Sequence, residues 1–144
     1  MNTVKFFSVA FLALGYTVVA QDIDSAKKAI DAEQLEKAKT ILKGFIKTKP
    51  DSGRANFLLG TVYLQQMYQD SAKAAFQKGV TLKDGGSLNY IGLGQIDLDN
   101  GNSSGAQFNF DQALKDASKK NIEPYVYVGK AFTKSEKADA KKAI

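Results

Sequence analysis

Apolar residues of this chain recur with a constant period of about 34 residues, and no other feature constrains its fold as strongly. The first two columns of the repeat are Ala38, Ala72, Ala106 and Ala140, and Leu42, Phe76, Phe110 and Ile144. The other two are Ala26, Gly60 and Gly94, with Gly129 one residue late, and Phe45, Gly79 and Ala113. A period of this length predicts repeated copies of one small supersecondary unit, stacked so that neighbours share a core.

The spacing inside each unit is helical. Ala55, Leu58, Leu59, Val62 and Tyr63 follow the order i, i+3, i+4, i+7, i+8, and the same order recurs over residues 38–46 and 72–80. Such spacing puts one apolar stripe on an α-helix. Each unit is therefore predicted to be a pair of antiparallel helices.

Polar, turn-forming segments separate these helices at residues 51–53, 68–71, 84–87 and 99–105. Asp70 or Ser71 is expected to cap the helix that follows, and Pro124 suits the first turn of another. The small residues of a pair, such as Gly60 and Ala72, are expected where the two helices approach most closely. The alternative is an ordinary helical bundle with coincidental spacing.

Three segments resemble the tetratricopeptide repeat family. LLGTVY at 58–63 resembles the core of the family's leading helix, and SAKAAFQKGV at 71–80 and GAQFNFDQAL at 105–114 resemble the core of its second helix. Asp97 departs from the usual Tyr, and Ala26 and Ala29 from the usual Gly and Tyr. The resemblance implies an all-α, right-handed superhelix of stacked antiparallel helix hairpins, with repeats at about 22–52, 53–86, 87–120 and, in part, 122–144.

The resemblance also implies a concave face lined by the leading helix of each hairpin. The partner-binding residues expected there are Arg54, Phe57, Thr61, Gln65, Leu88, Ile91, Gln95, Asp99, Val126, Lys130 and Lys134. This mixture of aromatic, aliphatic, amide and cationic groups suits an extended peptide or a partner helix. Phe57, Leu88 and Ile91 could instead only complete the core. The Lys and Asn positions with which some family members bind a peptide carboxylate are not matched by Ile23, Lys27, Phe57 and Thr61.

Residues 1–20 have the pattern of a secretory signal peptide. Lys5 precedes an apolar run, and Val18 and Ala20 occupy the −3 and −1 positions of a cleavage site before Gln21. The alternative is a retained membrane anchor, for which the apolar run is short. We expect residues 1–20 to be removed and residues 21–144 to form the helical domain, in the periplasm or outer cell envelope of a bacterium.

The composition excludes several kinds of chemistry. The chain has no Cys and no His, which removes disulfides, thiol nucleophiles, His-based triads and the usual zinc ligands. The net charge of the chain is +5, and Arg54 is its single arginine. Because the other basic residues are lysines interleaved with acids, a solvated surface is favoured over nucleic-acid binding. Asp97–Ser103 is only a poor match to a Ca²⁺-binding loop, because its Gly is one position early and Phe108 stands where a Glu is needed. No catalytic, metal or cofactor site is expected.

Together these features predict an exported scaffold that binds a protein or peptide partner, and no enzyme. Two alternatives remain: the docking or regulatory part of a larger envelope enzyme or sensor, and a carrier of a small ligand. Because no polar capping helix follows the fourth unit, we expect the chain to continue past Ile144 in the full protein.

Overall fold

A computed structural model describes residues 23–115, 117 and 120–142, so the expected signal peptide lies outside the described residues. The described part of the chain is all-helical, with seven helices and no strand, which confirms the predicted all-α class. The first helix covers residues 23–31. It is followed by α2 (Leu35–Thr48), α3 (Gly53–Gln65), α4 (Gln69–Gly79), α5 (Gly86–Asp99), α6 (Ser103–Leu114) and α7 (Glu123–Lys142).

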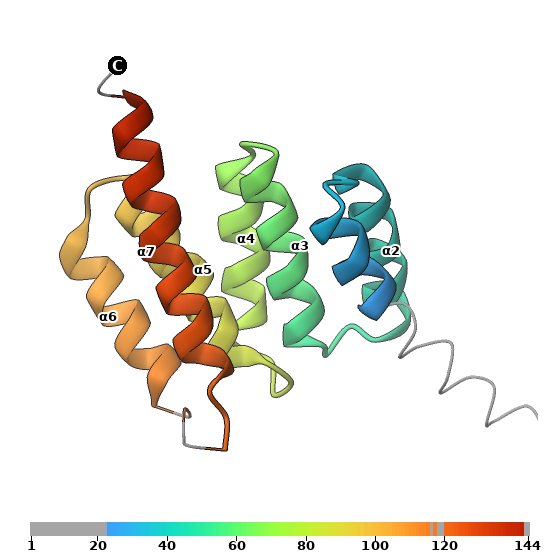
Figure 1. Ribbon diagram of the computed structural model, residues 1–144. Coiled ribbons are helices and arrows are strands. Elements are labelled where there is room, and N and C mark those ends of the chain that lie inside the picture. The colour runs from blue at the N-terminus through green and yellow to red at the C-terminus, as the bar shows by residue number, and fades with distance from the viewer. Residues whose placement is uncertain (1–22, 116, 118–119, 143–144) are drawn as a thin grey trace, which may run out of the picture.

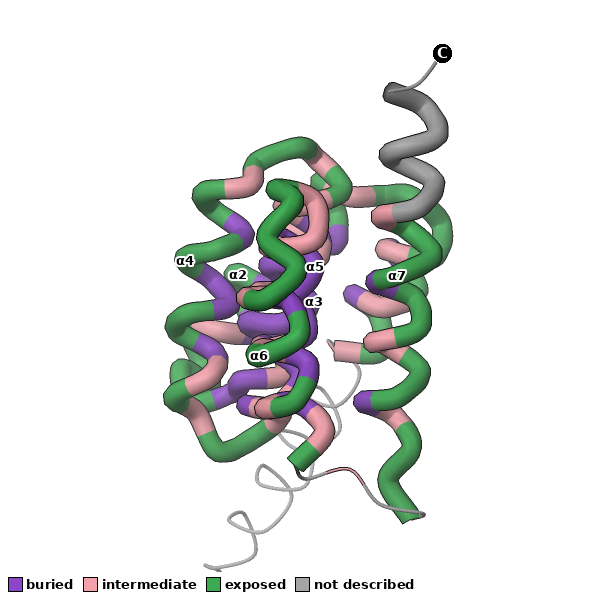
Figure 2. The backbone as a smooth tube through the Cα atoms, turned by 90° about the vertical axis from the view of Figure 1, so that its left-hand side faces the viewer, coloured by how far each residue is buried: buried purple, intermediate pink, exposed green. Residues whose placement is uncertain are grey.

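Helices that are neighbours in sequence pack against each other, and alternate helices also meet. α3 packs on α4 and α5 on α6, each pair joined by a short turn, while α5 also contacts α3, α4 and α7 (Figure 1). Figure 2 shows buried residues concentrated along α3 and α5, with exposed residues on the outer sides of α4 and α7. α3 and α5 are thus the central helices, flanked on one side by the first helix and on another by α7.

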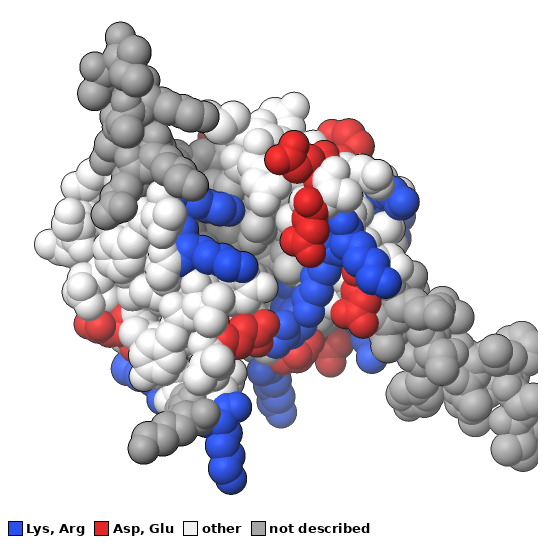
Figure 3. Space-filling view, in the orientation of Figure 1, with Lys and Arg blue, Asp and Glu red and all other residues white. Residues whose placement is uncertain are grey.

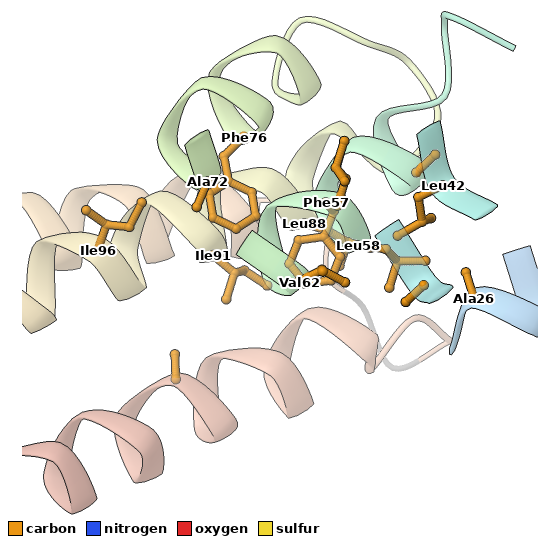
Figure 4. Packing of buried hydrophobic residues seen from close by; sticks show 14 of the residues in the cluster. Ala26, Leu42, Phe57, Leu58, Val62, Ala72, Phe76, Leu88, Ile91 and Ile96 are labelled. Carbon is orange, nitrogen blue, oxygen red and sulfur yellow. The ribbon is translucent and has the colours of Figure 1, made fainter. Parts of the chain in front are cut away.

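The repeat columns lie in the core. Ala38, Ala72 and Ala106 are buried, and so are Leu42, Phe76 and Phe110, the corresponding large residues one helical turn later. Gly60, Gly79 and Gly94 are buried as well. Ala140 and Ile144, the last members of two columns, fall where no side chains are described. Figure 4 shows Phe76 projecting from α4 toward Phe57 and Ile91 in the centre of this core.

Glycine is required opposite the large aromatic residues of the core. A Cβ on Gly60 would lie 2.3 Å from the ring of Phe76, and a Cβ on Gly92 would lie 2.4 Å from the same ring. On the next hairpin, a Cβ on Gly94 would lie 2.5 Å from the ring of Phe110. Gly60 therefore makes room for the ring of Phe76, which lies one turn beyond Ala72 on α4.

The capping prediction was wrong for α4. This helix begins at Gln69 after Tyr68, so Asp70 and Ser71 lie inside its first turn and cap nothing. Side-chain caps are found instead at Ser52, whose Oγ accepts from the Ala55 amide at 3.2 Å, and at Asn102, whose Oδ1 accepts from the Gly105 amide at 3.1 Å.

The fourth unit differs from its prediction. The repeat predicted a hairpin whose second helix includes Ala140, but α7 runs as one helix from Glu123 to Lys142. Gly129, the late member of its column, is exposed and has nothing within 4 Å of the position of a Cβ. Unlike Gly60 and Gly94, Gly129 therefore has no aromatic ring of the described residues against it.

Candidate functional site

A groove of about 980 Å³ runs between the first helix, α3, α5 and α7. Its floor is formed by α3 and α5, and its two sides by the first helix and α7 (Figure 1). Apolar side chains that line it include Ile30, Phe57, Leu58, Leu64, Phe76, Ile91, Tyr127 and Ala131. The polar ones include Lys27, Asp31, Thr61, Gln65, Gln69, Gln95, Asp99, Asn100, Lys130 and Lys134.

Most of the residues expected on the concave face line this groove. Eight of them do so: Phe57, Thr61, Gln65, Ile91, Gln95, Asp99, Lys130 and Lys134. Phe57 and Ile91 are only 4% and 3% exposed, so they belong to the core and form the groove floor at the same time. Completing the core and lining the groove are therefore not exclusive roles for these two residues.

Three expected residues lie elsewhere. Leu88 is 2% exposed and is part of the core, whereas Arg54 forms an ion pair with Glu123. Val126 is 48% exposed and does not line the groove. The reason is the adjacent Tyr127, which buries its ring against Phe57; successive residues are about 100° apart around a helix, so Val126 then points away.

One end of the groove is aromatic. The rings of Phe57 and Tyr127 meet edge to face with centroids 5.0 Å apart, and Phe57 lies 6.1 Å from Phe76. Partial burial raises the pKa of the Tyr127 hydroxyl, so this group stays protonated and can donate a hydrogen bond. The Tyr127 side chain is half-buried.

An ion pair joins α3 to α7 one turn before this aromatic contact. Nη1 of Arg54 donates to Oε1 of Glu123 at 2.7 Å, and Nη2 donates to Oε2 at 2.6 Å. The guanidinium holds the pKa of Glu123 below its usual value, and the carboxylate raises the pKa of Arg54. This bidentate pair fixes the start of α7 against α3, so Arg54 shapes the groove end instead of offering a free charge.

Polar groups also line the groove. Nε2 of Gln95 donates to Oδ1 of Asp99 at 2.8 Å, and the ammonium group of Lys130 lies 5.4 Å from the centre of the Tyr127 ring. Within the described part of the chain, no carboxylate lies within 4.0 Å of the ammonium groups of Lys130 and Lys134. Figure 3 shows basic side chains projecting from α7 on this face and side chains of both signs near the first helix.

Sequence reasoning missed the contribution of the first helix. Lys27, Ile30 and Asp31 line the groove, although the repeat containing them matches the family poorly. The signal was present in the spacing, because Lys27 lies one repeat period before Thr61, and Asp31 lies one period before Gln65. Extending the groove columns back by one period would have found both.

The described residues offer no constellation for metal chemistry. They contain no group of three or more Asp or Glu side chains placed to hold a metal ion. Asp99, expected in a turn, is the last residue of α5. Asp97 also lies within α5, where it accepts hydrogen bonds from Asn102 and Asn109. None of the helices described is long and apolar enough to span a bilayer.

Comparison of the chain with models of known protein families gives no match, and neither does comparison with curated proteins. The repeat pattern and the geometry of the groove are therefore the basis for assigning a function.

Proposed function

We propose that this protein is a tetratricopeptide-like superhelical scaffold that binds a peptide or a helix of a partner protein in the groove between the first helix, α3, α5 and α7. The observation that carries the proposal is the groove itself, which is lined by eight of the residues that the resemblance to tetratricopeptide repeats implies for the concave face. Neighbouring helices of the described chain pack against each other, and the proposal is that they continue this packing as a regular superhelix.

The lining suits a polypeptide ligand. A partner's apolar side chains would pack on Phe57, Ile91 and Tyr127, while Gln65 and Gln95 offer amides that can hydrogen-bond its backbone. Helices, not loops, position most of these groups, so little ordering is needed when the partner binds. Binding, with no chemistry of its own, is the activity proposed.

A small amphiphilic ligand is the second candidate. The aromatic end beside Phe57 and Tyr127 could take an apolar group, and the volume of about 980 Å³ falls at the upper end of the range found for small-molecule sites. We place it second because the lining is mixed, with amides and charges along much of its length.

A pair of matched threonine variants tests the proposal. Thr61 lines the groove and Thr40 lies exposed on α2, and each hydroxyl donates to the carbonyl four residues before it. The long cationic side chain of Thr61→Arg would fill the groove, whereas Thr40→Arg adds the same side chain outside it. Peptides selected from a displayed random library against the wild-type chain, and proteins captured from a bacterial envelope extract, would be measured against both variants.

We expect binding to weaken at least tenfold in Thr61→Arg and to be unchanged in Thr40→Arg, with both variants as helical as the wild type by circular dichroism. Equal binding by Thr61→Arg and wild type would refute the groove as the site. If neither selection yields a ligand but a lipid extract does, in a manner sensitive to Thr61→Arg, the small-ligand candidate replaces the scaffold.

We also propose that the chain is exported and acts in the periplasm or outer envelope. The support is the charge and apolar pattern of residues 1–20, which lie outside the described structure.

A further inference from the structure

The groove side of α7 carries two exposed lysines one helical turn apart. Tyr127, Lys130, Ala131 and Lys134 line the groove, and their spacing of i, i+3, i+4 and i+7 puts them on one side of the helix. Lys130 and Lys134 are both exposed, and their Cα atoms are about 6 Å apart along the axis of α7. The wall that α7 contributes to the groove is therefore cationic (Figure 3).

These two lysines form no ion pair with the described part of the chain, where no carboxylate lies within 4.0 Å of either ammonium group. The sequence of α7 explains why, because none of the residues three or four positions away is acidic. These residues are Val126, Tyr127, Thr133 and Lys134 for Lys130, and Lys130, Ala131, Lys137 and Ala138 for Lys134. Two like charges one turn apart also repel each other. Anions bound beside them would offset this repulsion.

The other charged groups of the groove are engaged with neighbours or lie across the groove from α7. The carboxylate of Asp99 accepts from Nε2 of Gln95 at 2.8 Å. Lys27, on the first helix, lies close enough to Glu123 to help lower the pKa of that carboxyl group. Asp31 follows Lys27 one turn later on the same wall. The positive charge open to a partner is thus on the α7 side.

We propose that the partner segment bound in this groove is acidic: two of its side-chain carboxylates meet Lys130 and Lys134, and a nearby apolar side chain packs on Phe57, Ile91 and Tyr127. The inference rests on the proposed function and names the chemistry of its partner. The ammonium group of Lys130 lies 5.4 Å from the centre of the Tyr127 ring, and that ring meets Phe57 edge to face. Apolar and cationic surfaces therefore adjoin, which suits a segment that combines both kinds of side chain.

The spacing of the two lysines limits the pattern of acidic residues. Side chains on one face of an extended peptide recur every second residue, at about 6.6–6.8 Å, and side chains on one face of a helix recur every fourth residue, at about 6 Å. Acidic residues at either spacing match Lys130 and Lys134. The net charge of +5 adds a weaker long-range attraction. Local and overall charge both favour an acidic segment over a basic one.

Peptides selected from a displayed random library against the wild-type chain supply the probe. The selected peptides would be synthesised with both termini blocked, together with copies in which Asn and Gln replace Asp and Glu. Affinities would be measured for the wild type, for the double variant Lys130→Gln with Lys134→Gln, and for the double variant Lys73→Gln with Lys78→Gln. The second double variant is the control: it has the same net charge, and its lysines are exposed on α4 outside the groove.

We expect the selected peptides to carry Asp or Glu two or four positions apart. Because two partly exposed ion pairs are lost, these peptides should bind about five- to tenfold more weakly to the Lys130→Gln, Lys134→Gln variant and unchanged to the control. Their amide copies should bind the wild type and both variants alike. The difference seen at about 0.1 M salt should largely disappear at about 1 M salt.

The results that would overturn the proposal differ from those that would refute the groove. Selected peptides without acidic residues, or acidic peptides that bind both double variants equally, would overturn the acidic partner; the groove remains a peptide site if Thr61→Arg still weakens binding. Peptide binding that Thr61→Arg leaves unchanged would refute the proposed function and this inference with it. Capture of a fatty acid and of no peptide, in a manner that needs Lys130 and Lys134, would assign the anion to a lipid and would also overturn the proposal.

Discussion

Replacing Gly60 by Ala tests the packing on which the whole fold depends. The added Cβ would lie 2.3 Å from one carbon of the Phe76 ring and 2.6 Å from another, whereas ordinary contacts begin near 3.4 Å. The ring would have to move by about 1 Å. The ring cannot move freely toward α5, because it already packs so closely on Gly92 that a Cβ there would lie 2.4 Å from it.

The expected magnitude follows from two opposing effects. Overpacking a full core costs about 1–3 kcal/mol, and Phe76 is completely buried. Replacing Gly by Ala inside a helix returns about 1 kcal/mol. We therefore expect Gly60→Ala to lower the free energy of unfolding by about 0–2 kcal/mol. Gly44→Ala, where the Cβ meets nothing, should raise it by about 0.5–1 kcal/mol.

Urea denaturation followed by circular dichroism at the helical minimum measures both changes. A second substitution tests the cause: Phe76→Leu removes the ring, so its cost should be smaller in the Gly60→Ala background than in the wild type. Equal stability changes at Gly60 and Gly44, or strictly additive effects of Gly60→Ala and Phe76→Leu, would show that the ring is not seated on Gly60.

Three further predictions follow from the ion pair and from the N-terminus. Arg54→Ala should lower the free energy of unfolding by about 1 kcal/mol, because its ion pair with Glu123 is bidentate but about a third exposed. A double-mutant cycle with Glu123→Gln in urea denaturation measures the coupling energy between the two side chains, and a coupling energy of zero would contradict the ion pair. The folded pKa of Glu123 is lowered, so the stability it contributes is complete above its unfolded pKa of about 4.3 and is lost as the pH falls through the lower folded value. Urea midpoints of wild type and Glu123→Gln should accordingly converge as the pH is lowered through this window, and a constant difference would refute the assignment. Expression in a bacterial host followed by N-terminal sequencing of the secreted chain should give Gln21 as the first residue, whereas a chain retained in the membrane with Met1 intact would support an anchor.

The sequence by itself determined the helical class, most of the helices and most of the core. Period and spacing suffice for this, because residues such as Ala72 and Phe76 must share one face of a helix wherever that helix is placed. The resemblance to the tetratricopeptide repeat family implied most of the residues that line the groove.

The tertiary structure decided where individual side chains meet across helices. Periodicity gives the direction of a side chain from its own helix axis and says nothing about what faces it, so the seating of Phe76 against both Gly60 and Gly92 could not be read from either segment alone. The pairing of Arg54 with Glu123 joins residues 69 positions apart, and it depends on how α7 docks after the turn that precedes it. The same docking buries Tyr127 against Phe57 and turns Val126 out of the groove, because the larger ring stabilises the orientation that removes it from water.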